Sequence, residues 1–326
     1  MHFTLNSTPP APAKRVVLFH RDFRAFTGGH LKIWDYFNHV AATPGCAARI
    51  AFSPESKWDA TNPWLRSRDA VVSWEPAKAD ILFLAGTDWR AVPAAQRENP
   101  PKPIINLIQH PRHAEQGSEL RGFLKHRAIR ICVSEEVAAA IKGTGDVNGP
   151  VFVIPNGIDV SSIPSAKELN ERATDLLICG LKAPELGRLA YTHFAGKNRV
   201  VRWLIEWIPR KEYLMHLADA KITLFLPRPS EGFYLPALEG MGAGTVVVCP
   251  DCVGNRSFCL DGVNCFRPSY DGNDILDAVS HALQQTEIER GAMQGQAQGT
   301  ILAHSLEKER ADFLRILERL PELWVG

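Results

Sequence analysis

The sequence lacks several features that would place it in a simple class. None of its apolar runs approaches the ~18 consecutive apolar residues of a membrane-spanning helix. It has no surplus of one charge, because 37 Lys and Arg stand against 36 Asp and Glu, so the overall charge gives no support to a nucleic-acid partner. With 45% hydrophobic and 22% charged residues, the composition is that of an ordinary globular protein of about two domains.

Secretion signals and a disulfide framework are also missing. Residues 1–15 have no apolar core of signal-peptide type, so we expect a cytoplasmic protein. Seven cysteines, an odd number, are scattered along the chain, which favours a reducing compartment. Four of them (Cys249, Cys252, Cys259 and Cys265) suggest zinc or a redox pair, but their later gaps do not match the usual paired arrangement. We therefore favour structural cysteines.

Short apolar segments alternate with segments of helical period in the first half of the chain. Strands are expected at 16–19, 48–52, 81–84, 104–108, 129–133 and 151–154. Each is apolar along its whole length, as in a parallel sheet that is covered on both faces. A helix is expected over about 30–42, and Ser134 followed by two glutamates predicts another helix start.

A second alternating series follows a polar linker at 160–174. Strands are expected near 175–179, 199–204, 222–226, 245–249 and 264–267, with helices between them and a helical end over about 273–320. Two such series predict an α/β protein with two Rossmann-like, doubly wound parallel-sheet domains that face a central cleft. Ligands bind beyond the carboxyl ends of such strands, so functional residues are expected in the loops that follow them.

The segment from Glu231 to Glu239 carries the most informative pattern. It follows the strand expected at 222–226 and opens a helix, which places Glu231 in the loop and Glu239 about two turns into the helix on a similar face. Backbone N–H groups at the helix start offer a cradle for a phosphate, and the carboxylates can accept hydrogen bonds from sugar hydroxyls. Two glutamates at this spacing are usually ordinary surface residues, so the neighbouring sequence decides whether they form a functional site.

That neighbouring sequence resembles the donor-site signature of GT-B glycosyltransferases, in particular of glycosyltransferase family four. The signature is Glu, seven residues, Glu, with Gly-Phe and a Leu after the first Glu, as in 231–239. The small-residue turn and the elements after it resemble 240–248, 251–256 and 260–266, and the domain junction resembles 131–134 and 153–159. The resemblance extends over about 106–279 and is strongest over 231–266.

The resemblance implies a GT-B enzyme with an acceptor-side domain at 1–157, a nucleotide-sugar donor domain at 158–304 and a helix at 305–326 that returns to the first domain. The implied reaction moves a sugar from a nucleotide-sugar donor to an acceptor hydroxyl with retention, in the assembly of a surface glycan or glycolipid. The implied partners are this donor and a glycan or lipid-linked acceptor. No Asp-x-Asp motif occurs, which fits a metal-independent site without a cofactor.

The resemblance also implies roles for individual residues. Glu231 would hold the donor sugar at its reacting face, and His110, after the strand at 104–108, would be the second catalytic residue; His113 is a weaker candidate. Glu239 would accept hydrogen bonds from the ribose. Gly28 and Gly29 have no side chains and would let the backbone approach a phosphate or the acceptor. The donor-binding set is Gly28, Gly29, Lys182, Arg188, Gly232, Phe233, Tyr234, Leu235 and Glu239.

The sequence departs from the family at the phosphate position. Where the family usually has an Arg and a Lys, this chain has Leu181 and Leu186, so we expect the neighbouring Lys182 and Arg188 to supply the charge. Tyr234 replaces a common glycine, and its ring would narrow the sugar pocket or stack on the sugar. A nucleoside-monophosphate donor, a non-catalytic GT-B-like subunit, a nucleotide-sugar epimerase and a phosphorylase stay open as alternatives.

Two further stretches have two interpretations each. The basic stretch 121–130 is either a solvated helix face or a face that meets an anionic membrane, which would place the protein at the inner face of that membrane. The stretch from Trp203 to Trp207 either packs in the core or stacks on the donor's base. The sugar, the base, the acceptor, the linkage and the oligomeric state stay open.

Overall fold

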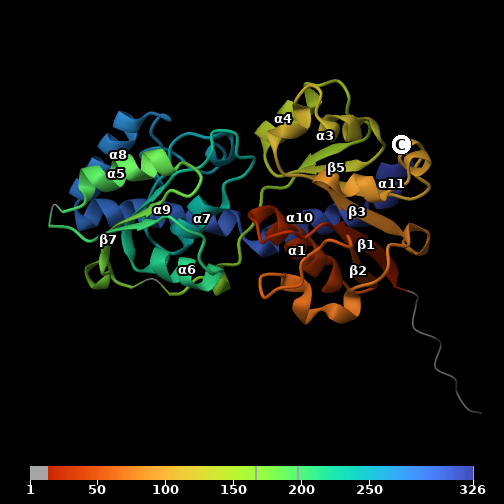
Figure 1. The fold of residues 1–326 in the computed structure, drawn as a ribbon, viewed down its shortest axis with the longest axis horizontal. Coiled ribbons are helices and arrows are strands. Elements are labelled where there is room, and N and C mark those ends of the chain that lie inside the picture. The colour runs from red at the N-terminus through yellow and green to blue at the C-terminus, as the bar shows by residue number, and fades with distance from the viewer. Residues whose placement is uncertain (1–13, 166, 197, 326) are drawn as a thin grey trace, which may run out of the picture. The chain divides into compact units, whose positions relative to one another are not determined.

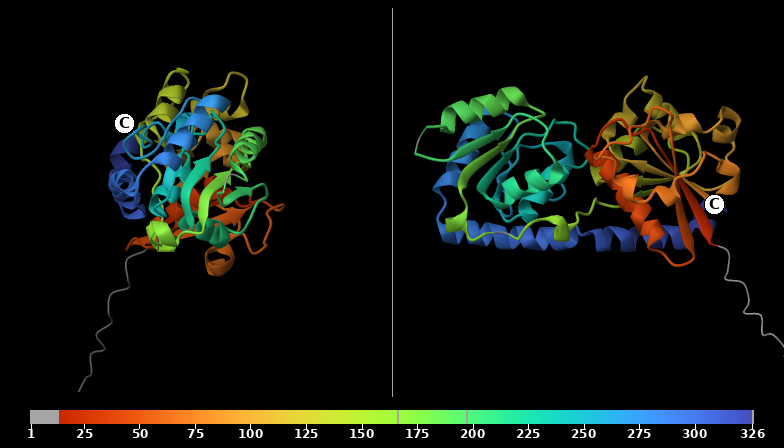
Figure 2. Two further views of the ribbon diagram at one scale, coloured as in Figure 1. Left: turned by 90° about the vertical axis from the view of Figure 1, so that its left-hand side faces the viewer. Right: turned by 60° about the horizontal axis from the view of Figure 1, so that its bottom comes forward.

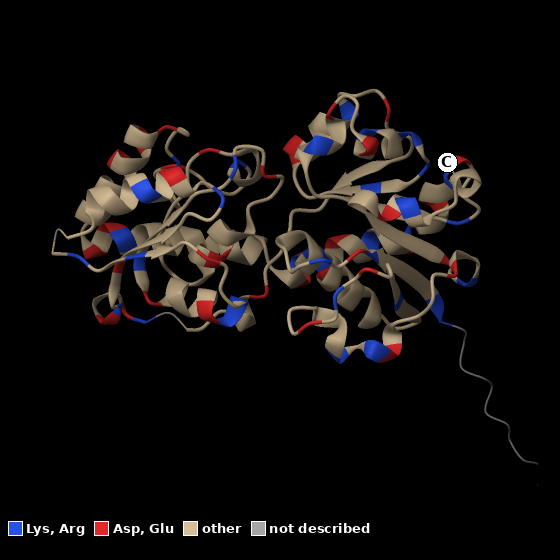
Figure 3. Ribbon diagram, viewed as in Figure 1, with Lys and Arg blue, Asp and Glu red and all other residues tan. Residues whose placement is uncertain are grey.

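The computed structural model describes residues 14–165, 167–196 and 198–325. The described residues divide into two compact units: unit 1 consists of those up to residue 107 together with 127–129, and unit 2 of those at 108–126 and from residue 130 onward. The elements form two parallel sheets with helices around them (Figures 1 and 2). Acidic and basic residues are interspersed along the chain (Figure 3), in keeping with its small net charge of +1.

The larger sheet has six strands in the order β2-β1-β3-β4-β5-β6. Its strands are β1 (Arg15–Arg21), β2 (Cys46–Phe52), β3 (Ile81–Ala85), β4 (Ile104–Ile108), β5 (Ile129–Cys132) and β6 (Val151–Val153). The pairs β1–β2, β1–β3, β3–β4 and β5–β6 are parallel. Every residue of β3 and β4 is buried, which confirms the predicted sheet with both faces covered.

The two longer helices beside this sheet begin at residues whose side chains cap them. The side chain of Thr27 accepts a hydrogen bond from the backbone N–H of His30 and starts α1 (Gly28–Ala41). Ser134 does the same for α4 (Glu135–Lys142), as its sequence predicted. The remaining helices here are the short α2 (Ala94–Glu98) and α3 (Glu119–Gly122), and most of the connections between 63 and 91 are short 3-10 turns that the sequence pattern did not reveal.

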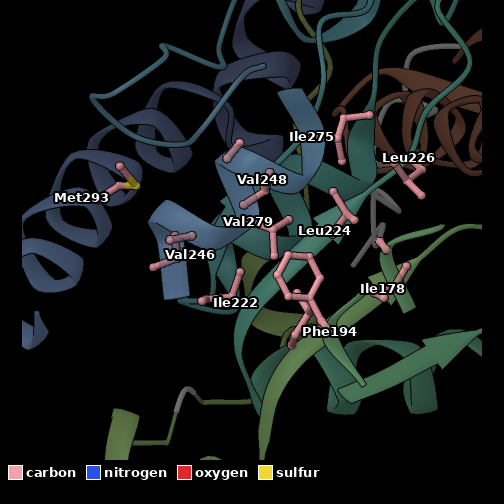
Figure 4. Close-up of a cluster of buried hydrophobic side chains, with 14 residues drawn as sticks. Ile178, Phe194, Ile222, Leu224, Leu226, Val246, Val248, Ile275, Val279 and Met293 are labelled. Atoms are coloured by element: carbon pink, nitrogen blue, oxygen red, sulfur yellow. The ribbon is translucent and has the colours of Figure 1, made fainter. Parts of the chain in front are cut away.

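The smaller sheet, in unit 2, has the order β10-β9-β7-β8. Its strands are β7 (Thr174–Cys179), β8 (Val201–Leu204), β9 (Ala220–Phe225) and β10 (Val246–Val248), and all three of its strand pairs are parallel. One face packs on α5 (Pro184–Phe194), α8 (Gly272–Gln284) and α9 (Glu287–Ala303), and Figure 4 shows Ile275 and Val279 of α8 over Leu224 and Val248. Successive strand residues point to opposite faces, so Phe225 points the other way and meets α7 (Leu235–Gly242).

The C-terminal part differs from the prediction in two places. The strand expected at 264–267 forms only isolated bridges, because Pro268 has no N–H with which to continue the ladder. The helical end is divided into α8, α9, α10 (Leu306–Glu318) and α11 (Leu320–Val325), since Thr286 and Ser305 each cap a new helix. Within the part of the chain that the structure describes, no helix is long and apolar enough to cross a bilayer.

Candidate functional site

The loop between β9 and α7 holds the first of the two predicted carboxylates. The strand β9 ends at Phe225, the chain turns through residues 226–234, and α7 begins at Leu235 with Pro236 in its first turn. Glu231 lies in this loop with its side chain 17% exposed, as expected for a residue that follows the carboxyl end of a parallel strand. The sequence therefore places Glu231 correctly in the fold.

The backbone around Gly232 is held against three other segments of unit 2. A Cβ atom on Gly232 would lie 2.0 Å from the carbonyl oxygen of Gln109, so only glycine fits at this contact. The hydroxyl of Ser134 donates to the carbonyl oxygen of Gly232 over 3.2 Å. On its other side the loop meets Gly254, where a Cβ would lie 2.7 Å from the backbone nitrogen of Phe233. The loop that carries Glu231 is thus fixed on both sides.

Each of the two predicted carboxylates is paired with a cation. Lys182 follows β7, and its Nζ lies 2.7 Å from Oε1 of Glu231. Glu239 on α7 is only 3% exposed, and its Oε1 lies 2.5 Å from Nη1 of Arg210. Lys182 therefore lies beside Glu231, and its expected contact with a donor phosphate stays a prediction.

Arg210 is the functional candidate that sequence reasoning missed. It is the first residue of α6 (Arg210–Ala218), directly after Pro209, and its side chain is 30% exposed. Tyr213, one turn further along α6, has a buried hydroxyl without a hydrogen-bond partner among the described residues. Burial raises the pKa of Tyr213 well above its ordinary value, and the nearby charge of Glu239 adds to the effect. The only local signal for Arg210 is a cation at a predicted helix start after the second strand of the series.

His110 lies next to Gln109, beside the fixed loop. Its Nδ1 accepts the backbone N–H of Arg112 over 3.0 Å. Burial and the charge of Arg112 lower the pKa of His110 below its ordinary value, although Glu231 acts in the opposite direction. A neutral imidazole that accepts at Nδ1 carries its proton on Nε2. His110 therefore offers an N–H donor, and its pKa is influenced by both Glu231 and Lys182.

Besides Glu239, three of the predicted donor-binding side chains are buried in unit 2. Phe233 packs on Phe258 with ring centroids 5.1 Å apart, and Leu235 is 7% exposed. Tyr234 is 4% exposed and meets Phe225 edge-on, while Nζ of Lys182 lies 5.3 Å from the centre of the Tyr234 ring. These side chains support the loop from inside, and their contact with a donor stays a prediction.

Gly180 and Gly187, which lie next to Leu181 and Leu186, leave room for the ring of Trp203. A Cβ on Gly180 or Gly187 would lie within 3 Å of Nε1 of Trp203, at 2.9 and 2.7 Å respectively. The indole N–H of Trp203 is buried without a hydrogen-bond partner among the described residues. Trp203 therefore packs against the core of unit 2, whereas Trp207 at the other end of the stretch is 57% exposed.

The remaining predicted residues are Arg188 and His113 in unit 2 and Gly28 and Gly29 in unit 1. Arg188 is on α5 and pairs with Glu185 over 3.9 Å, so its contact with a phosphate stays a prediction. Gly28 and Gly29 are the first residues of α1, in unit 1. His113 is buried, and burial lowers its pKa to about 3.

The basic stretch at 121–130 is not one helix. It runs through α3, a 3-10 turn and the start of β5, and Arg130 within it is fully buried, where it donates to the carbonyl groups of residues 123, 124 and 126. Arg121 pairs with Asp146 over 2.7 Å. These two arginines are therefore engaged within the fold.

All seven cysteines are free, and six of them are buried. Burial raises the pKa of Cys259 well above its ordinary value, and its hydrogen-bonding contacts with Cys249 and Cys265 add to the effect. Within the described ranges no group of three or more His, Cys, Asp or Glu side chains is arranged to hold a metal ion. The interpretation of these cysteines as structural agrees with their burial.

Comparisons with known proteins agree with this geometry. Residues 160–285 match the family described as glycosyl transferases group 1. A comparison with curated proteins finds no match.

Several solved structures are similar along nearly the whole chain. Sucrose-phosphate synthase from Thermosynechococcus elongatus has a TM-score of 0.71 at 11% identity, over 94% of this chain and 99% of its own. Anabaena Alr3699/HepE in complex with UDP-glucose has a TM-score of 0.73 at 14% identity, over 93% and 99%. The α,α-trehalose 6-phosphate synthase from Burkholderia multivorans has a TM-score of 0.66 at 12% identity, over 95% and 99%.

The expected fold is confirmed by these matches. Two parallel α/β sheets, of six and four strands, correspond to those of GT-B glycosyltransferases, whereas family four in particular stays a prediction. The chain has the GT-B fold, and its residues 160–285 match the family of glycosyl transferases group 1.

Proposed function

We propose that the protein is a retaining glycosyltransferase that moves a hexosyl or related sugar from a nucleotide-sugar donor to an acceptor hydroxyl. The observation that supports this most is the pair of carboxylates at Glu231 and Glu239, each next to a cation, along one fixed loop and the helix that follows it. Carboxylates suit the hydroxyls of a sugar and a ribose, and cations suit the phosphates between them.

Donor binding would exchange the partners of these four side chains. Glu231 and Glu239 would accept hydrogen bonds from hydroxyls, while Lys182 and Arg210 would turn to phosphate oxygens. The exchange at Lys182 costs little, because its side chain is 44% exposed and exposed ion pairs contribute only about 0–1 kcal/mol. Arg210 would thus supply the charge that Leu181 and Leu186 cannot. Two cations at the phosphates would let the site work without a metal ion.

The chemical step would break the bond between the anomeric carbon and the phosphate oxygen and form a bond to the acceptor oxygen on the same face of the sugar. The proton of the acceptor hydroxyl would leave with the departing phosphate. His110 would donate its Nε2–H to a sugar hydroxyl, because its neutral form offers a donor there. Glu231 would stabilise the charge that develops at the sugar ring.

For the donor and the acceptor we propose chemical classes and no single compound. Uridine diphosphate sugars are the first donors to test, because the similar HepE structure was determined with UDP-glucose. We propose a glycan or lipid-linked acceptor and a role in assembling a surface glycan or glycolipid, at the inner face of a membrane. Nucleotide binding without turnover would favour a non-catalytic subunit instead.

A thermal-shift screen against UDP, GDP, ADP, TDP, CMP and their sugar conjugates tests the proposal, first without metal and then with Mg²⁺. A ligand that binds the native state raises its melting temperature by mass action. We expect a nucleoside diphosphate to raise it without metal, whereas a response to CMP alone would indicate a monophosphate donor. No response to any nucleotide would contradict the proposed donor site.

The substitution Glu239→Gln is expected to weaken nucleotide binding. It removes a charged hydrogen-bond acceptor worth about 1.5–3 kcal/mol, or roughly a 10–100-fold rise in Kd, and keeps the size of the buried side chain. Isothermal titration with the nucleotide found in the screen measures the change. Glu212→Gln, at an exposed carboxylate on α6, is the matched control. An unchanged Kd for Glu239→Gln would remove Glu239 from the nucleotide site.

A further inference from the structure

The helix α9 has two opposite faces of different character. Its inner face carries Met293, Ala297 and Ile301, which are all buried, and Figure 4 shows Met293 in the apolar cluster of unit 2. We call the opposite side, where residues recur every three or four positions, the outer face of α9. It consists of six exposed residues: Ile288, Gly291, Ala292, Gly295, Gly299 and Leu302.

The outer face has none of the polar side chains that the solvent side of a helix normally carries. A surface helix usually places charged or polar residues opposite its buried face, whereas the polar residues of α9 lie on its flanks. Ile288 and Leu302, at the two ends of the outer face, are 85% and 77% exposed. The outer face is therefore an apolar surface that no described residue of the chain covers.

The three glycines of the outer face have no packing role within one chain. A Cβ on Gly291, Gly295 or Gly299 would meet no atom of the described residues within 4 Å. Glycine is, after proline, the least favourable residue inside a helix, so each of the three destabilises α9 relative to alanine. Glycine does allow a second backbone to approach closely, and the distance between two packed helices depends on the side chains at their contact. The glycines thus indicate a helix as the partner.

The order of residues along the outer face is symmetrical about Gly295. Gly291 and Gly299 lie four positions before and after it, and Ile288 and Leu302 lie seven positions before and after it. Two copies of α9 that pair antiparallel about a two-fold axis at Gly295 would bring Ile288 of each copy opposite Leu302 of the other, with glycine opposite glycine between them. A two-fold interface between identical chains requires a self-complementary surface of this kind.

We propose that the outer face of α9 is the interface of a homodimer, in which two copies of this chain pair antiparallel through this helix. The partner is a second copy because the symmetry of the outer face about Gly295 makes the surface complementary to itself. The outer face contains no residue of the proposed donor site, so the proposal does not depend on the proposed function. Four turns of one helix bury less than the ~800 Å² per partner of a standard interface, so we expect a weak dimer with a Kd on the order of 10–100 µM.

Sedimentation velocity of the full chain, from about 1 to about 300 µM, tests the interface, and we expect the share of dimer to rise with concentration. Gly295→Glu places a carboxylate at the two-fold axis, where it would meet its own copy, and should raise the Kd of the dimer at least about tenfold. The melting temperature of the dilute variant should equal or exceed that of the unchanged protein, because glutamate favours a helix more than glycine does. Gln296→Glu adds the same charge about 100° further around the helix and is the matched control, with an unchanged Kd.

Two double variants test the antiparallel pairing. Ile288→Lys/Leu302→Glu places opposite charges together at both ends of an antiparallel pair, whereas Ile288→Glu/Leu302→Glu places like charges there. We expect the first to dimerise at least about tenfold more tightly than the second. A chain that stays monomeric over the whole concentration range, or a dimer that Gly295→Glu leaves unchanged, would overturn the interface. Equal Kd values for the two double variants would overturn the antiparallel pairing.

Discussion

Replacing Glu231 by Gln is expected to lower kcat about 100–1,000-fold, the effect of removing one preorganised charge from the reacting centre. The Kd of the donor should change less than kcat, because Glu231 is proposed to act mainly on the charge that develops at the sugar ring during the reaction. Stability should hardly change, since Lys182 loses only a partly exposed ion pair, worth about 0–1 kcal/mol. Initial rates of sugar transfer, together with donor titrations, separate the two parameters.

The control for this substitution is Glu185→Gln. The side chain of Glu185 on α5 is 82% exposed, and its Oε1 lies 3.9 Å from Nη2 of Arg188. It is thus a glutamate paired with a cation, like Glu231, but it lies outside the proposed site. Its kcat should equal that of the unchanged protein. A kcat for Glu231→Gln that is equally unaffected would exclude Glu231 from the chemical step, even if nucleotides bind.

The substitution Gly232→Ala is expected to abolish most of the activity and to destabilise unit 2. The new Cβ would lie 2.0 Å from the carbonyl oxygen of Gln109, so the loop or the segment at 109–110 must move. A displacement of about 1 Å at a reacting centre can cost 100-fold in rate, and overpacking typically costs about 1–3 kcal/mol. The measurements are kcat/KM and the free energy of unfolding from chemical denaturation.

Gly291→Ala is the matched control for this experiment. Gly291 lies on α9, where an added Cβ meets no atom within 4 Å. The substitution should stabilise the helix by up to about 1 kcal/mol and leave the rate unchanged. Wild-type activity and stability in Gly232→Ala would show that the loop does not need its contact with Gln109.

Much of the fold could be predicted because its signals are local. The apolar runs that became β3 and β4 are buried on both faces, and Ser134 caps α4 through a bond three residues away. The predicted strand at 264–267 was wrong because the apolar residues there resemble a strand, whereas Pro268 interrupts the ladder. An apolar run predicts that a segment is buried, but it does not predict which segment forms the backbone hydrogen bonds with it.

Only those site residues that lie together in one short segment of the sequence could be predicted. Glu231 and Glu239 lie within a single motif, so their placement in a loop and a helix could be predicted. The pairing of Arg210 with Glu239 joins residues 29 positions apart on two helices, and no periodicity connects them. Gly232 was predicted as part of a phosphate cradle; its missing side chain is also what lets it approach Gln109, more than a hundred residues earlier in the chain.

The slot around Trp203 has a consequence for how this chain can change over evolutionary time. The indole nitrogen lies 2.9 Å from where a Cβ on Gly180 would be and 2.7 Å from where one on Gly187 would be, so a larger residue at either position requires the ring at position 203 to move or to be smaller. A smaller ring in turn would leave a void between two glycines that have no side chain to fill it. We therefore expect substitutions at Gly180, Gly187 and Trp203 to be coupled, because none of the three can change in size without strain or a void at the other two.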